Sequence, residues 1–147
     1  MKIPLYNADV DAQGQPEAVL RCKELVVGAD ALLLVSPEYN NGVPGVLKNA
    51  IDWLSRPAQD ARRVFGDLPV ALTGVSPGGF GTMLSQVAWL PILRTLGMRL
   101  YSERDLYVSR GHTLFADGKL TDDATREKLR QLVTGFAAYA ERLPRRR

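Results

Sequence analysis

Two polar loops in the sequence carry backbone and side chains that could hold a ligand. One covers residues 36–42 and the other covers residues 76–81, and each directly follows an apolar segment. Glycines at 78, 79 and 81 would let the backbone come close to a ligand, where a larger side chain would obstruct it. A helix beginning beyond each loop would add partial positive charge. The pattern predicts a ligand site at these loops, where the partial positive charge favours an anionic group.

The apolar segments before these loops predict two buried parallel strands. Residues 31–35 are apolar without alternation, which is typical of a strand covered on both faces, and residues 69–75 follow the same pattern. Alternating strands and helices predict an α/β fold with right-handed crossovers. Because the carboxyl ends of parallel strands meet at one edge of a sheet, we expect both loops to open on that edge.

Helix signals surround the two strands. Helices are predicted from Pro16 to about Val27 closed by Gly28, from Pro44 to about Ser55, from Thr82 to Leu96 closed by Gly97, and from a cap at Thr121 to about Leu143. The other segments are predicted as an extended arm (1–14), a polar connection (58–68), one strand or two short ones (98–108) and a loop (109–120).

Length and composition indicate one globular domain over residues 1–147. The hydrophobic content is 46% and the charged content is 24%, so the chain can bury one core. A net charge of +3 without a basic face predicts no nucleic-acid site. The sequence shows neither a signal peptide nor an apolar run of membrane-spanning length, which predicts a cytoplasmic protein without membrane partners. Cys22 is the sole cysteine, and we expect it to pack within a helix rather than to do redox chemistry.

Several other kinds of site are excluded by residue type and spacing. The glycines of the second loop do not form a nicotinamide fingerprint, because the third glycine position falls on Leu84, and they are not followed by Gly-Lys-Ser/Thr. His112 is the single histidine, so a histidine-cluster metal site is excluded, and we expect it to be a loop residue. Trp53 and Trp89 lie at helix spacing and are predicted core or interface residues. We assign no catalytic side chain and no metal ligand.

The first loop and the helix after it resemble the signature of a known family. The segment 36–57 reads SPEYNNGVPGVLKNAIDWLSRP. It resembles the signature segment of the NADPH-dependent FMN reductases, which include quinone, azo-dye and chromate reductases. The resemblance implies a flavodoxin-like three-layer fold around a parallel sheet. It also implies FMN as cofactor and NADPH or NADH as co-substrate.

The resemblance also implies which residues flank the flavin ring. In the family, the first loop and the Gly-rich loop form the two walls. By position, the cofactor-binding residues would be Pro37, Glu38, Tyr39, Asn40, Asn41 and Gly42 on one wall and Ser76, Pro77, Gly78, Gly79 and Gly81 on the other. Glu38 and Tyr39 could equally serve a subunit contact, and residues 78–81 could be only a flexible strand-to-helix turn.

The activity implied by the resemblance is hydride transfer from the nicotinamide through the flavin to a quinone, azo compound, metal oxyanion or free flavin. The flavin supplies the chemistry, so no protein acid or base is required. A homodimer or homotetramer is implied as well. One alternative is a non-catalytic remnant or partner subunit of a flavodoxin-like assembly. The other is a flavodoxin-type electron carrier, against which the low acidity of the chain argues.

The resemblance begins only at residues 5–7, Leu-Tyr-Asn. The opening strand and phosphate-binding loop of the family have no counterpart before this point, so we expect a sheet that is N-terminally incomplete, with strand 31–35 at its edge. Three explanations are open: a start placed too late, a degraded gene, or a missing half supplied by oligomerisation or a partner. We favour truncation of a normal reductase.

Overall fold

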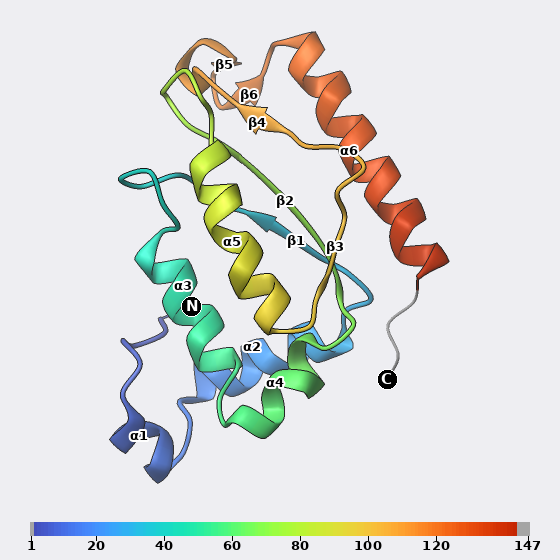
Figure 1. Ribbon diagram of the computed structural model, residues 1–147. Helices are drawn as coiled ribbons and strands as arrows, with labels where there is room; N and C mark the ends of the chain where they lie inside the picture. The colour runs from blue at the N-terminus through green and yellow to red at the C-terminus, as the bar shows by residue number, and fades with distance from the viewer. Residues whose placement is uncertain (1, 144–147) are drawn as a thin grey trace.

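The computed structural model describes residues 2–143, which form a parallel sheet flanked by helices on both faces (Figure 1). The elements in chain order are α1 (Ala8–Gln13), α2 (Glu17–Gly28), β1 (Leu32–Val35), α3 (Gly45–Leu54), α4 (Ala58–Phe65), β2 (Pro69–Val75), α5 (Met83–Thr95), β3 (Arg99–Leu100), β4 (Tyr107–Val108), a 3-10 turn (Gly111–Thr113), β5 (Phe115–Ala116), β6 (Lys119–Leu120) and α6 (Asp123–Arg142).

β2 is the central strand, and every strand that pairs with it runs parallel to it. Leu32 of β1 lies opposite Val70, while Arg99 of β3 and Tyr107 of β4 pair with the start and end of β2 on its other side. The predicted parallel sheet is therefore confirmed. Within residues 2–143, β1 pairs only with β2 and lies at an edge of the sheet.

Helices α2, α3, α4 and α5 supply the core on one face of the sheet. Trp53 and Trp89 are both fully buried there, as their helical spacing predicts. The strands contribute alternate residues, such as Val70 and Leu72 of β2, because successive side chains of a strand point to opposite faces. Cys22 packs against this core, and burial raises the pKa of its thiol.

The opposite face of the sheet is covered by α6 (Figure 1). Ala71 of β2 meets Leu132 and Phe136 of α6, and Tyr101 packs between the rings of Phe136 and Tyr139 at centroid distances of 5.7 and 5.4 Å. This smaller core holds α6 against the sheet along the C-terminal part of the helix.

Two segments predicted without helix contain one. In the arm, the Asn7 side chain accepts hydrogen bonds from the N–H groups of Asp9 and Val10 and starts α1. In the connection 58–68, α4 forms because Val64 and Phe65 face the core and are fully buried. Its polar outer face concealed this helix in the sequence.

The segment 109–120 is also more ordered than the predicted loop. It contains the 3-10 turn and the β5–β6 hairpin, whose turn is formed by Asp117 and Gly118, both with positive φ. Asp-Gly is a strong signal for such a turn, and the prediction overlooked it. Asp122, not Thr121, caps α6 by accepting from the N–H of Thr125 at 2.7 Å.

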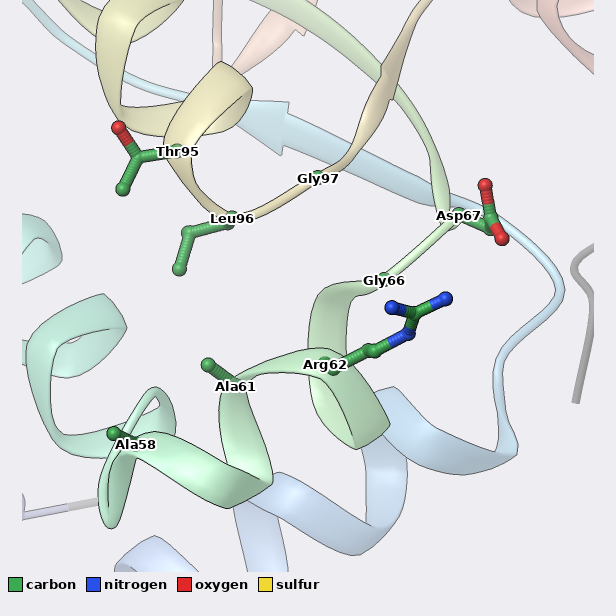
Figure 2. A pocket seen from close by; sticks show the side chains of 8 residues that line it. All are labelled: Ala58, Ala61, Arg62, Gly66, Asp67, Thr95, Leu96 and Gly97. Atoms are coloured by element: carbon green, nitrogen blue, oxygen red, sulfur yellow. The ribbon is translucent and has the colours of Figure 1, made fainter.

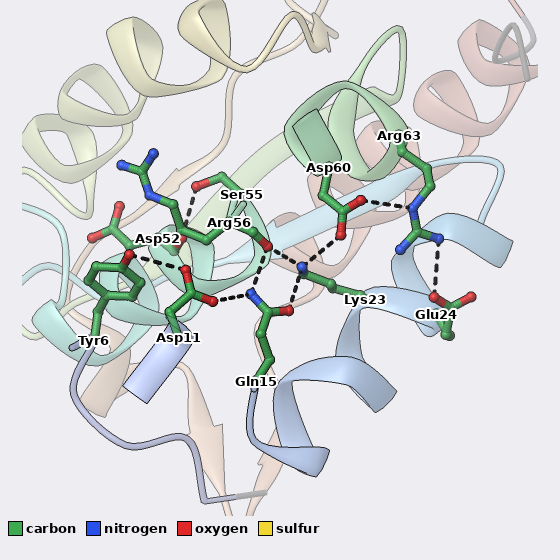
Figure 3. A network of polar contacts seen from close by, with 10 residues as sticks. All are labelled: Tyr6, Asp11, Gln15, Lys23, Glu24, Asp52, Ser55, Arg56, Asp60 and Arg63. Atoms are coloured by element: carbon green, nitrogen blue, oxygen red, sulfur yellow. Dashed lines mark hydrogen bonds and ion pairs between the residues drawn. The ribbon is translucent and has the colours of Figure 1, made fainter. Parts of the chain in front are cut away.

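A buried lysine connects the arm, α2 and α4. Lys23 is 1% exposed, and its ammonium donates to the Gln15 side chain at 2.6 Å, to Asp60 at 2.9 Å and to the Arg56 carbonyl (Figure 3). Asp60 also accepts from Arg63, which pairs with Glu24 of α2. The network lies beside the larger core and satisfies the buried charge, as burial of an ammonium requires.

None of the helices within residues 2–143 is long and apolar enough to cross a membrane.

Candidate functional site

The two predicted loops meet at the carboxyl edge of the sheet, where β1 and β2 end. The N–H of Ser36 donates to the Thr73 carbonyl at 2.9 Å, so the first loop leaves β1 still bonded to β2. A Cβ on Gly74 would lie 1.9 Å from the Ser36 oxygen. Gly74 is therefore required for the close approach of the first loop to β2, a role that the sequence analysis did not assign.

Glu38 joins the first loop to the helix beyond the second. Its carboxylate accepts from the N–H of Ser85, in the first turn of α5, at 2.9 Å. The Ser85 hydroxyl in turn donates to the Pro37 carbonyl at 3.2 Å. Both loops thus follow strands that end at the same edge of the sheet, as expected, and the sequence analysis missed the contact of Ser85 with the first loop.

The rest of the first loop is a tight turn. Tyr39 and Gly42 exchange backbone hydrogen bonds at 3.0 and 3.2 Å. Asn40 and Asn41 between them have φ of 50° and 60°, a left-handed conformation that asparagine tolerates better than most residues. Tyr39 is 60% exposed, so its ring stands at the rim and is free to lie against a ligand or a second chain.

The second loop is fixed at its ends and open in its middle. Ser76 donates its N–H to the Val108 carbonyl at 3.0 Å and its hydroxyl to the Gly81 carbonyl at 2.6 Å. Gly81 has φ of 64°, and a Cβ there would lie 2.8 Å from the backbone of Tyr107. The packing of the loop on β4 therefore accounts for Gly81.

Gly78 and Gly79 differ from Gly81, because a Cβ on either would meet open space. Within residues 2–143 a Cβ on Gly79 has no atom within 4 Å, and one on Gly78 meets only the Ser76 hydroxyl, at 3.8 Å. Pro77 beside them is exposed. These glycines leave a stretch of bare, exposed backbone that a flat ring could approach.

A third segment supports the second loop and was expected only to be a loop. Arg110 donates its N–H to the Gly78 carbonyl and Gly111 donates to the Ser76 carbonyl, both at 3.0 Å. A Cβ on Gly111 would lie 2.5 Å from a methyl of Val75, so this position also needs glycine. The next residue, His112, is exposed within the 3-10 turn.

The arrangement fits a planar cofactor ring and offers little acid–base chemistry. The open backbone at Gly78 and Gly79 is a cradle that side chains would fill, and the Glu38–Ser85 contact ties the first loop to the helix that follows this cradle. Among residues 2–143 no group of histidine, cysteine and carboxylate side chains could hold a metal ion. The bare backbone at Gly78 and Gly79 leaves room for a planar ring.

A cavity of about 430 Å³ lies at the other end of the sheet, where β2 and β3 begin (Figure 2). It is lined by Ala58, Ala61, Arg62, Gly66, Asp67, Thr95, Leu96 and Gly97. The Asp67 carboxylate is engaged by Arg99 at 2.9 Å. The last carbonyls of α4 and α5 carry partial negative charge toward this space, and neither predicted loop contributes to it. Size alone does not make this cavity the functional site.

Comparison with known proteins connects the loops to a family. A family model described as NADPH-dependent FMN reductase matches residues 1–113. An NAD(P)H-dependent FMN reductase from Pseudomonas aeruginosa is 42% identical over 142 residues, which cover 96% of this chain and 75% of the relative. A quinone reductase from Pseudomonas putida is 38% identical over 139 residues, covering 95% of this chain and 74% of the relative.

A solved structure agrees with these relatives. FerB, a flavoenzyme NAD(P)H:(acceptor) oxidoreductase from Paracoccus denitrificans, superimposes with a TM-score of 0.85 at 35% identity. The match covers 97% of this chain and 78% of FerB. The similarity therefore includes the sheet, both loops and the helices that follow them.

Proposed function

This chain belongs to the NADPH-dependent FMN reductase family, and on that premise we propose that it binds FMN between its two loops and passes hydride from NADPH or NADH to a small electron acceptor. Quinones are the acceptor class that the relatives favour, since several relatives are named quinone reductases. The observation that carries the proposal is the open backbone at Gly78 and Gly79, at the same edge of the sheet as the first loop.

Each loop would contribute one wall of the ring site. Residues 37–42 and residues 76–81 are the proposed cofactor-binding segments, with backbone N–H groups available to the ring carbonyls. Gly78 and Gly79 would let the ring lie against the main chain, and Tyr39 at the rim could cover it. Bound FMN would supply the hydride-accepting and hydride-donating atom, while the protein orients it and excludes competing reactions.

The test is retention of FMN and turnover by the purified chain. FMN is added, unbound flavin is removed by desalting, and the absorption spectrum is recorded before NADPH oxidation is followed with benzoquinone. A retained flavin band with shifted fine structure, together with quinone-dependent NADPH oxidation, is expected. A folded protein that retains no flavin would overturn the proposal.

A matched pair of variants tests the ring site. Gly79→Leu should place a side chain where the ring lies and weaken FMN binding by about tenfold or more. Gly28→Leu is the control, because a Cβ there also meets open space, but at the exposed end of α2. Equal FMN affinity in both variants would contradict the placement of the ring against Gly79.

We further propose that two copies associate through α5. Met83, Val87 and Leu90 recur along one side of this helix and are 39%, 52% and 41% exposed, and Leu84 beside them is 44% exposed. A continuous apolar face without charge suits a self-complementary two-fold contact, because no like charges are brought together. Val87→Glu should shift sedimentation toward monomer, whereas Val133→Glu on α6 should not.

A cytoplasmic location and a single domain over residues 1–147 complete the proposal. The cytoplasmic location is supported by the single cysteine, Cys22, because proteins of reducing compartments rarely contain disulfides. The second is supported by β2, which contributes to the cores on both faces of the sheet.

A further inference from the structure

The first turn of α5 is capped by a side chain from a distant loop. The first N–H groups of a helix have no partner within the helix. Thr82 occupies the N-cap position, yet within the described residues its side chain makes no capping bond. The Glu38 carboxylate, 47 residues away in sequence, accepts from the Ser85 N–H instead.

This contact is reinforced by hydroxyl groups that are shielded from water. Ser36 and Ser85 are 1% and 0% exposed, and their hydroxyl oxygens lie 3.5 Å apart. Both hydroxyls donate to the Pro37 carbonyl, at 2.9 Å from Ser36 and 3.2 Å from Ser85. The backbone of 37–38 is therefore held to α5 by several bonds, of which the bond to the carboxylate is charge-assisted and strongest.

The contact sets the spacing between the two loops. α5 begins at Met83, two residues after Gly81, so its first turn follows closely on the second loop. Gly81 packs against the backbone of Tyr107, and the bond from Ser85 to Glu38 ties the first loop to this fixed segment. Loss of the carboxylate would release residues 37–42 from the second wall.

The same carboxylate alters the electrostatics that the sequence predicts. The N-terminus of α5 was expected to favour an anionic ring through its partial positive charge. Glu38 occupies that helix end and offsets its charge. A negative side chain thus lies beside the slot, where it opposes the accumulation of negative charge on a bound ring.

We propose that Glu38 is a positioning residue that fixes the width of the flavin slot and lowers the reduction potential of the flavin held there. The effect on the reduction potential, which is the flavin half of this inference, rests on the proposed function. The positioning of the first loop by Glu38, which is its structural half, does not require flavin, because the capping bond exists in the protein alone.

The experiment compares Glu38→Ala and Glu38→Gln with wild type. In flavin-free protein, amide hydrogen exchange by NMR should show the Ser85 N–H roughly tenfold less protected in Glu38→Ala, while amides of β2 stay unchanged. Glu38→Gln keeps an acceptor oxygen and should retain most of the protection. The β2 amides separate a local release from general destabilisation.

Flavin titration and redox titration supply the second readout. Glu38→Ala should weaken FMN binding by about tenfold. Glu38→Gln should bind FMN within a few-fold of wild type, yet raise the midpoint potential of the bound flavin, because a negative charge has been removed. Glu141→Gln is the control, since Glu141 is an exposed carboxylate near the end of α6.

The outcomes separate this inference from the proposed function. Unchanged Ser85 exchange and unchanged FMN affinity in Glu38→Ala would overturn the positioning role while the reductase proposal stands. An unchanged potential in Glu38→Gln would overturn the electrostatic role. If wild type retains no FMN, the proposed function and the flavin half both fail, and the exchange result alone decides whether Glu38 holds the loops together.

Discussion

The two faces of the sheet share the same central strand but are covered very differently. On the face of α2, α3, α4 and α5, Trp53, Phe65 and Trp89 are fully buried. On the face of α6, the core is smaller, and a cavity of about 170 Å³ lies between the helix and the carboxyl ends of the strands. Val35 and Phe115, which line that cavity, are 63% and 46% exposed.

The difference shows that an apolar strand composition does not by itself tell how completely each face of the strand is covered. Residues 31–35 are apolar throughout, and this predicts cover on both faces. We call the face covered by α2, α3, α4 and α5 the closed face. In the part of the chain that the structure describes, Leu34 is buried on the closed face, whereas Leu33 is only partly buried on the α6 face. We therefore expect substitutions on the two faces to have unequal effects on stability.

The largest contrast is expected from removing one phenylalanine on each face. Phe65→Ala should reduce the free energy of unfolding by about 3–5 kcal/mol, because it opens a cavity in a closed core. Phe136→Ala should lose less, by about 2–3 kcal/mol, since Phe136 packs in the smaller core and keeps 7% of its surface exposed.

Urea unfolding of the flavin-free protein measures both, with Phe115→Ala as the exposed control. Equal losses for Phe65→Ala and Phe136→Ala would show that the α6 face is as well packed as the other and would abolish the comparison.

The buried lysine of the closed face should give the next largest effect. Lys23→Met leaves the Gln15 oxygen without its donor, leaves the Arg56 carbonyl with the Gln15 amide alone and leaves Asp60 with Arg63 alone. We expect the free energy of unfolding to fall by about 1–3 kcal/mol. This is less than is usual for breaking a buried ion pair, because Asp60 is 30% exposed and can be hydrated again. Lys119→Met in the exposed hairpin is the control and should change little.

The effect of Lys23→Met should depend on pH. The hydrogen bond from Lys23 lowers the pKa of Asp60, with further contribution from Arg63. A lowered pKa in the folded state stabilises the protein above the unfolded value of about 3.9, and this contribution is lost as pH falls through the folded pKa. The difference in the free energy of unfolding between wild type and Lys23→Met should therefore be largest at neutral pH and shrink below about pH 4. A gap that grows on acidification would show that Asp60 is not the partner that matters.

Adding one methylene to each face should change stability in opposite directions. Val70→Ile enlarges a fully buried residue of β2 on the closed face and should cost about 1 kcal/mol or more. Val108→Ile lines the cavity under α6 and should stabilise by up to about 0.8 kcal/mol, because the added group is buried in space already present. Thermal unfolding of both variants decides the point. Destabilisation by Val108→Ile would mean that the cavity is too narrow to accept it.

The sequence predicts the strands and the two named loops because their signals are local. The apolar run of 69–75, the glycine at 97 and the proline at 44 each fix a backbone feature without help from distant residues. α4 escapes prediction because its polar side chains dominate its composition, and only tertiary packing buries Val64 and Phe65. The signal that could have found the β5–β6 hairpin was present as Asp117-Gly118.

The site is less predictable than the fold because its key contacts join residues far apart in sequence. The motif points to residues 36–42 and 76–81, yet the Glu38–Ser85 bond joins residues 47 positions apart and depends on where α5 packs against the sheet. The glycine pattern also conceals two different roles. Gly81 is required by Tyr107, whereas Gly78 and Gly79 leave open space, and no spacing rule separates them.

The smallest effect should come from Cys22, which reports on the closed face without a destabilising change. Burial raises the pKa of its thiol, so less thiolate is available for alkylation than at a free cysteine of the same pH. Alkylation of the native protein by iodoacetamide should therefore be slow at neutral pH, with a midpoint above the ordinary thiol pKa, and should approach the rate of a free thiol in urea. Because Cys22 packs against the larger core, Phe65→Ala should accelerate this labelling and Phe136→Ala should not. Equal acceleration by Phe65→Ala and Phe136→Ala would mean that the two faces open together and that their separate packing does not affect the exposure of Cys22.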